Sequence, residues 1–426
     1  GQEKAIWEII EDMRSGRVMN RLVQGDVGSG KTVVGAAALV FTVVNGFQGA
    51  LMAPTEVLAQ QQYLTLSQLL EPLGISCGYL AQAMPAPEKE KVLAGIADGS
   101  IQVVIGTHAL IQEAVKFKKL GLAVIDEQHK FGVFQRAALA KKSAQTPHLL
   151  FMTATPIPRT LSLTLYGDLD ISVMDQLPSG RQPIRTLWVG ENRRVEMYVF
   201  LDSLLEKGGQ GYVLCPLVDA KAALEAKNVL KTHEELSKIL TRRKFGILHG
   251  KMKSAEKKKV MQEFKDKKID VLISTVVIEV GIDVPNANIM MIENAERFGL
   301  AQLHQLRGRV GRGSEESFCV LFSEAQNEES LERLEAFTKI QSGFDIAEKD
   351  LSLRGGGDMI GEKQHGFPEL RIGDVVKDIE ILQLAKKEAR AIIASDPKLT
   401  TSQNRLIRRA IESRYGIKND TLTVSA

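Results

Sequence analysis

The sequence predicts an α/β protein with two parallel-sheet lobes in tandem, followed by a mostly helical C-terminal segment. Over the first 180 residues, short apolar runs alternate with helical patterns, which is typical of βαβ units. A second alternating series follows a stretch rich in proline and glycine at 178–183, and the alternation stops after residue 330. These observations predict domains at 1–180, 181–335 and 336–426.

The composition limits which classes of protein this sequence can belong to. The 426 residues are 44% hydrophobic and 25% charged, which is enough to bury two or three cores. The sequence has no stretch of about eighteen uncharged apolar residues and no signal-peptide pattern, so we expect a cytoplasmic chain without membrane contact. Cys77, Cys215 and Cys319 lie in apolar surroundings without metal-ligand spacing, which predicts neither a disulfide nor a zinc site. The net charge of +3 is too small to indicate a nucleic-acid partner.

The first series predicts strands at 21–24, 49–54, 101–106, 122–127 and 148–155. In a parallel sheet, ligands bind beyond the carboxyl ends of the strands. Polar side chains fall at these ends: Lys31, Thr55, Thr107, Asp126, Glu127 and Thr155. We therefore expect the chemistry of the first lobe at this edge.

The loop at 25–32, with the sequence Gly-Asp-Val-Gly-Ser-Gly-Lys-Thr, fits the Walker A pattern between a strand-like run and an apolar helix that Asn45-Gly46 would end. In such a loop, backbone N–H groups and the positive end of the helix dipole converge on a phosphate. Lys31 would reach the β and γ oxygens of ATP, and the Thr32 hydroxyl would bind Mg²⁺. The predicted nucleotide-binding residues of this loop are Gly25, Gly28, Ser29, Gly30, Lys31 and Thr32.

A metal-binding acid follows at the end of the apolar strand 122–127. Asp126 would hold Mg²⁺, and Glu127 would orient or deprotonate the attacking water. Lys31, Asp126 and Glu127 are therefore expected to act in catalysis.

The second series predicts strands at 184–189, 211–218, 245–249, 271–275, 289–293 and 317–322, without a second Walker A loop. It also contains the basic stretch 305–312, which begins with Gln305. Arg309 and Arg312 are placed to reach the γ-phosphate from across a cleft, so hydrolysis would depend on lobe closure. Gln305, Arg309 and Arg312 complete the expected catalytic set.

These motifs resemble those of superfamily 2 helicases, which have two RecA-like lobes. The matching stretches are 53–56 (motif Ia), 105–108 (Ib), 126–129 (II), 153–155 (III), 274–285 (V) and 305–312 (VI). The resemblance implies that Thr55, Thr107 and Thr275 contact nucleic-acid phosphates. It also implies that Asp283 lies near the ribose of ATP and that Gln2 lies near the adenine. His129, Thr153 and Thr155 would couple hydrolysis to movement.

The resemblance narrows to the RecG-type branched-DNA translocases of bacteria, through stretches 24–32, 126–133, 152–160, 300–309 and 350–355. The related transcription-repair coupling factors usually carry an aromatic residue in place of Ser29 and an acid in place of Gln128. One departure from the RecG pattern is Gly356, where the family commonly has proline. The resemblance also implies that Arg354 and Gln364 couple hydrolysis to movement. The run Gly355-Gly356-Gly357 beside Arg354 is expected to be a flexible interruption of the helical pattern.

The resemblance implies an ATP-dependent translocase on duplex and branched DNA that remodels stalled replication forks and Holliday junctions in recombination and repair. It implies a monomer near the bacterial nucleoid and, by family analogy alone, a contact with single-strand-binding protein. The family's N-terminal wedge domain has no counterpart in these residues, and the helical pattern that begins at Gln2 suggests a piece of a longer protein.

Three alternatives stay open at this stage. A transcription-repair coupling translocase or an RNA helicase would use the same motor. RNA is disfavoured by Asp-Glu-Gln-His at 126–129 and Thr-Ala-Thr at 153–155, in place of the Asp-Glu-Ala-Asp and Ser-Ala-Thr of common RNA helicases. A silent ATP-binding scaffold is disfavoured because it would need neither Glu127 nor the arginines.

Overall fold

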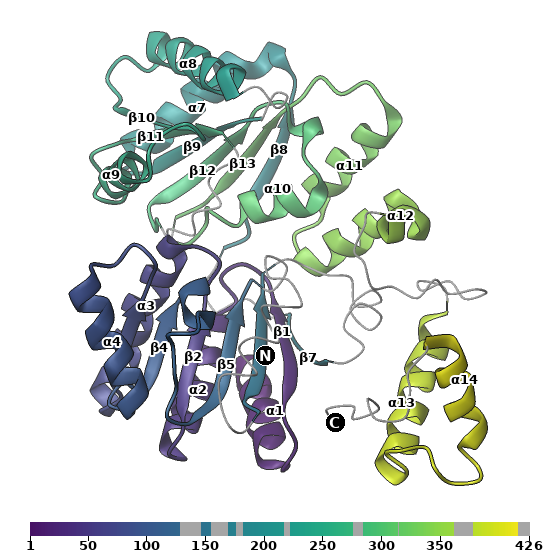
Figure 1. Cartoon of the computed structure of the whole chain (residues 1–426). Coiled ribbons are helices and arrows are strands. Elements are labelled where there is room, and N and C mark those ends of the chain that lie inside the picture. The colour runs from purple at the N-terminus through teal and green to yellow at the C-terminus, as the bar shows by residue number, and fades with distance from the viewer. Residues whose placement is uncertain are drawn as a thin grey trace.

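The computed structural model describes residues 1–127, 146–154, 169–175, 182–216, 222–275, 284–313, 315–361 and 378–415. Within them the chain forms two parallel sheets, each flanked by helices, and a helical C-terminal segment (Figure 1). We call the part around the first sheet lobe 1 and the part around the second sheet lobe 2. The predicted fold class is confirmed, whereas the exact domain boundaries stay predictions.

Lobe 1 contains a seven-stranded sheet in the order β3-β4-β2-β5-β6-β1-β7, with every pairing parallel. The strands are β1 (Asn20–Gly25), β2 (Gln48–Met52), β3 (Cys77–Leu80), β4 (Val103–Gly106), β5 (Leu120–Asp126), β6 (His148–Thr153) and β7 (Asp170–Met174). Five of them match the predicted strands. The two edge strands, β3 and β7, were not predicted.

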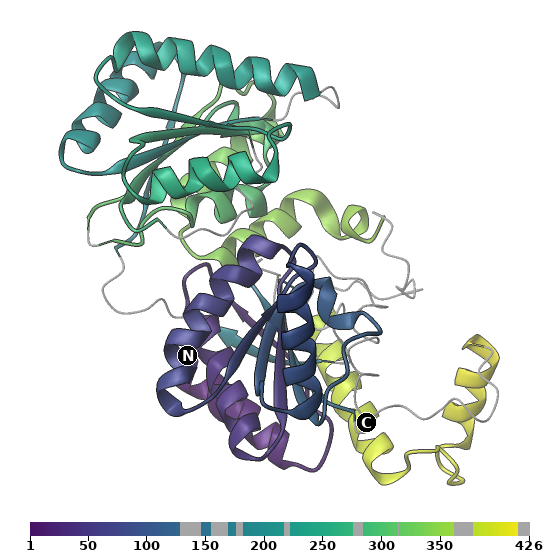
Figure 2. The ribbon, with the colours of Figure 1, turned by 60° about the vertical axis from the view of Figure 1, so that its left-hand side comes forward.

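Helices cover both faces of this sheet (Figure 2). They are α1 (Gln2–Arg14), α2 (Lys31–Val44), α3 (Glu56–Leu70) and α4 (Ala86–Asp98), with short 3-10 turns η1 (Glu71–Leu73) and η2 (His108–Ile111). Neighbouring residues of β1 point to opposite faces: Val23 packs into the core that includes Leu39 of α2, and Leu22 packs into the second core. As predicted, Asn45 and Gly46 end α2: the helix stops at Val44, Asn45 is its C-cap, and Gly46 has φ +81°.

Lobe 2 contains a six-stranded parallel sheet in the order β10-β11-β9-β12-β13-β8. Its strands are β8 (Arg185–Val189), β9 (Gln210–Cys215), β10 (Phe245–Leu248), β11 (Val271–Thr275), β12 (Ala287–Ile292) and β13 (Phe318–Phe322). The helical elements are η4 (Glu191–Arg193), α7 (Arg194–Glu206), α8 (Ala222–Ile239), α9 (Ser254–Lys265), η5 (Ala295–Arg297) and α10 (Leu300–Arg307). All six strands predicted for this lobe are confirmed.

The C-terminal segment is helical, as predicted, with α11 (Glu328–Lys339), α12 (Gly343–Gly361), α13 (Ile379–Ser395) and α14 (Arg405–Tyr415). In Figures 1 and 2, α12 lies beside the junction of the lobes, and α13 lies beside lobe 1. There Arg390 of α13 pairs with Asp170 at 2.8 Å. Within the described residues, no helix is long and apolar enough to cross a membrane.

One expectation about this segment is wrong. The run Gly355-Gly356-Gly357 was expected to interrupt the helix, but α12 continues through it to Gly361. Each glycine costs a helix only about 1 kcal/mol relative to alanine. The preceding part of α12 supplies the compensation, because Ile346 and Leu351 are buried.

Candidate nucleotide site and interlobe contact

The loop between β1 and α2 has the geometry of a phosphate cradle. Gly30 has φ +88°, a conformation that residues with a side chain rarely adopt, and a Cβ there would also meet the Gln2 side-chain amide. The Lys31 ammonium donates to the backbone oxygens of Gly25 (2.7 Å) and Asp26 (2.8 Å). Burial lowers the pKa of Lys31, although the nearby carboxylates of Glu127 and Asp126 oppose this shift.

Gln2, expected near the adenine, lies against the same loop. Its side-chain amide donates to the Ser29 backbone oxygen at 3.0 Å. The Ser29 hydroxyl is buried and has no hydrogen-bond partner among the residues that the structure describes. An unpaired buried hydroxyl in this loop is suited to a polar ligand.

The two acids lie at the carboxyl end of β5. Burial raises the pKa of Asp126 to about 6, and the nearby carboxylate of Glu127 adds to the effect. Lys31 and a hydrogen bond of 2.9 Å from Gln62 act in the opposite direction. Glu127 has φ +55°, a conformation that is uncommon outside glycine. A divalent cation would offset the crowded negative charge of these carboxylates.

Lobe 2 brings its basic stretch to the same place. Gln305 lies in α10, and Arg309 and Arg312 follow it. The positive charge of Arg312 lowers the pKa of Lys31, so the two cations lie close enough to repel each other across the lobes. The backbones approach closely here, because a Cβ on Gly308 would come within 2.9 Å of the Val27 Cβ.

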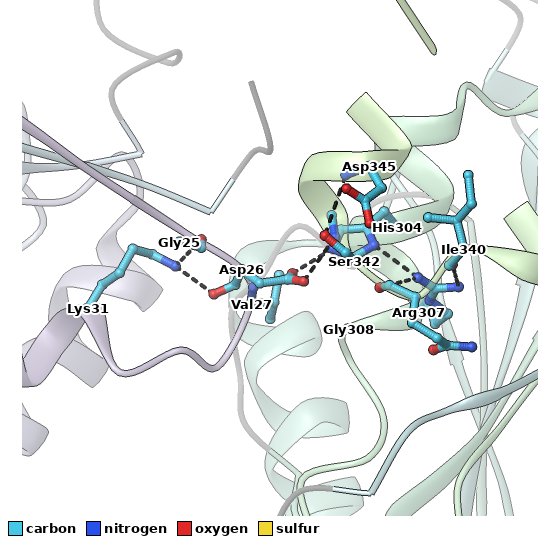
Figure 3. Close-up of polar contacts among 12 residues, drawn as sticks. Gly25, Asp26, Val27, Lys31, His304, Arg307, Gly308, Ile340, Ser342 and Asp345 are labelled. Carbon is cyan, nitrogen blue, oxygen red and sulfur yellow. Dashed lines mark hydrogen bonds and ion pairs between the residues drawn. The ribbon is translucent and has the colours of Figure 1, made fainter. Parts of the chain in front are cut away.

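A polar contact joins the lobes, and the sequence did not predict it. The Asp26 carboxylate lies 2.5 Å from His304 Nε2 of α10 and accepts the backbone N–H of Gly343 at 3.3 Å (Figure 3). On its other side, His304 Nδ1 lies 3.2 Å from Arg307 Nη2. Asp26 and His304 both belong to stretches that the motifs identified, but a linear pattern does not indicate which of its residues pair in space.

Two cavities differ in their relation to this site. One of about 360 Å³ lies between the lobes and is lined by Asp26, Val27, His304 and Phe344 among others. A larger one of about 820 Å³ is lined by Arg185, Lys207, Asn288 and Phe318, where the strands of lobe 2 begin. Ligands of parallel sheets bind at the opposite edge, so the chemistry of the loop, not cavity size, locates the site.

The residues predicted to bind DNA lie at strand ends, as expected. The Thr55 hydroxyl accepts the Leu58 backbone N–H at 3.3 Å and thereby caps α3. Thr107 is buried after β4, and Thr275 is fully buried at the end of β11. Their contact with phosphates stays a prediction.

The coupling residues are only partly described. Thr153, at the end of β6, is buried and lies beside Gln24 of β1 in the sheet. Arg354 lies in α12. Three other coupling residues lie outside the described residues: His129, Thr155 and Gln364. The same holds for Asp283, which was expected near the ribose.

Three protein families match successive parts of the chain. Residues 1–164 match the DEAD/DEAH box helicase family, residues 196–314 the helicase conserved C-terminal domain, and residues 340–422 the C-terminal part of domain 3 of the ATP-dependent DNA helicase RecG. The ATP-dependent DNA helicase RecG of Streptococcus pneumoniae is 45% identical over 97% of this chain and 61% of its own length. That of Bacillus subtilis is 46% identical over 93% of this chain and 58% of its own.

A solved structure of RecG bound to a three-way DNA junction aligns with a TM-score of 0.75 and 45% identity, over 90% of this chain and 50% of that one. The two parallel-sheet lobes and the matches of each lobe to a helicase domain place the chain in the helicase class. Within that class, the chain belongs to the RecG family. It spans 58% to 61% of the length of the two curated relatives.

Proposed function

We propose that this chain is the motor of an ATP-driven translocase that acts on duplex and branched DNA and remodels stalled forks and Holliday junctions. The observation that carries the proposal is the interlobe site, where the Walker A loop that holds Lys31 contacts His304 and Gly308 of lobe 2, directly before Arg309 and Arg312. The RecG structure bound to a three-way junction supports DNA as the partner. Because hydrolysis would need groups from both lobes, each cycle would open and close the cleft.

In this mechanism, Lys31 binds the β and γ phosphates of the substrate ATP, and Glu127 holds the attacking water and takes its proton. Arg309 and Arg312 stabilise the charge that develops as the terminal phosphoryl group is transferred. Thr32 and Asp126 would hold Mg²⁺, which when bound neutralises phosphate charge. The raised pKa of Asp126 fits this role, since a cation would relieve the repulsion between the adjacent carboxylates.

The test is a comparison of ATP hydrolysis by the chain alone and with linear duplex, forked duplex, single-stranded DNA and RNA. We expect strong stimulation by the two duplexes and weak stimulation by single strands. Stimulation by RNA above that by duplex DNA would contradict the proposal and favour an RNA helicase.

DNA binding should depend on salt and not on sequence. The predicted contacts, through Thr55, Thr107 and Thr275, are to phosphates, which carry neither sequence nor branch information. Basic side chains that neutralise phosphates release counterions, so we expect the affinity for duplex to fall roughly tenfold to a hundredfold between about 50 and 200 mM salt, with little preference for forks. Fluorescence anisotropy with matched linear and forked duplexes measures both effects. Tight, salt-insensitive binding to forks over linear duplex would place junction recognition within these residues and contradict the prediction.

We also propose that Arg354 and Gln364 couple hydrolysis to movement. The position of α12 beside the junction of the lobes supports a coupling role for Arg354. In the full-length protein, Arg354→Ala or Gln364→Ala should leave DNA-stimulated ATP hydrolysis near normal, while triplex displacement is lost. If hydrolysis and displacement fall in proportion, or neither changes, these residues are not coupling residues.

A further inference from the structure

Asp26 lies where three segments meet: the Walker A loop, α10 and the start of α12 (Figure 3). Its carboxylate accepts the N–H groups of Val27 (2.7 Å) and Gly343 (3.3 Å) and contacts His304 Nε2 (2.5 Å). Burial by itself would raise the pKa of Asp26, but the hydrogen bond from His304 and the two backbone N–H groups lower it below its usual value. Asp26 is therefore an anion held mainly by lobe 2 and α12.

The neighbours of His304 determine which of its nitrogens carries the proton. A guanidinium only donates, so His304 Nδ1 accepts from Arg307 Nη2. Nε2 then carries the hydrogen and donates to Asp26. The imidazole thus connects the buried cation of Arg307 with the partly buried anion of Asp26. The space is tight, because a Cβ on Gly343 would come within 2.7 Å of His304 Nε2.

Arg307 extends the chain of contacts to the C-terminal segment. Its side chain is 2% exposed. The guanidinium donates to the backbone oxygens of Ile340 (2.9 Å), Gln341 (2.9 Å) and Phe337 (3.2 Å), and it lies 4.4 Å from the centre of the Phe337 ring. Arg307 therefore fixes the end of α11 and the connection to α12.

Lys31 lies at the other end of this series of contacts. Its ammonium donates to the backbone oxygen of Asp26 at 2.8 Å. A phosphate bound by Lys31 would compete for the same N–H donors, since an ammonium has only three. The backbone of Asp26 thus meets the nucleotide-binding cation, and its side chain meets lobe 2.

We propose that Asp26 and His304 are positioning residues that pass the nucleotide state of the Walker A loop to Arg307 and the start of α12. This inference rests on the proposed function, because it supplies the route by which hydrolysis reaches the C-terminal segment. The competing account is that the contacts only pack the lobes together. Packing alone would not depend on which atom of residue 304 donates.

The test replaces His304 in the 426-residue chain with alanine, asparagine or glutamine. A glutamine amide reaches the position of Nε2 and can donate to Asp26, whereas asparagine reaches only the position of Nδ1. We expect His304→Ala and His304→Asn to lower the kcat of DNA-stimulated ATP hydrolysis about tenfold or more, as positioning contacts commonly do. His304→Gln should stay within about threefold of wild type. The affinity for a fluorescent ATP analogue should change no more than about twofold in any variant, since His304 is not placed to touch ATP.

Two further arms complete the design. Asp26→Ala combined with His304→Ala should lose no more kcat than the more severe single variant, because the two residues act as one unit. The control, His233→Gln, replaces a histidine of α8 whose ring packs on Phe245, and it should match wild type. Equal losses in the three variants at residue 304, multiplying losses in the double variant, or a loss of nucleotide affinity with kcat unchanged would overturn the inference.

A second measurement does not need hydrolysis. Hydrogen–deuterium exchange of the backbone at 337–346, with and without a non-hydrolysable ATP analogue, should change in the wild type and in His304→Gln but not in His304→Asn. If the chain binds the analogue but hydrolyses no ATP, the proposed function fails, while the exchange result still decides on the contacts. An identical exchange response in all three proteins would show that Asp26 and His304 transmit nothing.

Discussion

Lys31→Ala should abolish nearly all ATP hydrolysis by this chain while leaving DNA binding intact. Lys31 is held in the Walker A loop, where its ammonium contacts the backbone oxygens of Gly25 and Asp26. A cation placed against the β and γ phosphates typically contributes several kcal/mol to transition-state stabilisation. Arg312, whose charge acts on Lys31, belongs to lobe 2 and would bind the substrate from the other side. The measurement is steady-state hydrolysis at saturating ATP and duplex DNA, with DNA affinity measured in parallel.

Lys91→Ala is the matched control, because Lys91 is exposed on α4, and it should retain wild-type hydrolysis. Hydrolysis by Lys31→Ala above about a tenth of the wild-type rate would contradict the assignment of the loop. Loss of DNA binding together with hydrolysis would indicate that the substitution unfolds lobe 1.

The sequence predicted the sheets well because the central strands are buried on both faces and therefore read as short apolar runs. Edge strands carry a weaker signal. β3 alternates half-buried and buried residues, with Gly78 in its middle, and β7 carries Asp170 and Ser172. Their pairing is set by neighbours far along the chain, such as β1 for β7, and not by their own composition.

At the glycine run in α12 the sequence predicted an interruption that the structure does not have. Glycine lowers helix propensity, so a local reading predicts a break at 355–357. The helix nevertheless continues to Gly361, because tertiary packing of its first turns outweighs the local cost. Propensity is a weak guide where one end of an element is already fixed by packing.

Within the site, the motifs identified the loops but not the contacts between them. Asp26 occupies an unspecified position of the Walker A pattern, and His304 lies just before the arginine-rich stretch. They are 278 residues apart in the sequence, yet their side chains lie 2.5 Å apart. A contact across lobes depends on how the two sheets are placed in space, and no periodicity within either lobe reports it.

Replacement of the lobe 2 arginines should lower turnover far more than ATP affinity. Arg309 and Arg312 follow α10 directly, at the point where Gly308 packs against Val27 of the Walker A loop. Arginines supplied across a cleft act on charge that develops in the transition state and contribute roughly 10³ to 10⁵ in rate in related phosphoryl transfers. We expect Arg309→Ala and Arg312→Ala each to reduce kcat by about a hundredfold or more.

The decisive quantity is the split between kcat and KM, since an interaction made only in the transition state lowers kcat and leaves ground-state binding unchanged. Arg242→Ala is the control, because Arg242 is an exposed arginine of the same lobe, and it should behave like wild type. A rise in KM with kcat unchanged would make these arginines ground-state ligands. Hydrolysis would then need no group from lobe 2, and lobe closure would lose its role in the cycle.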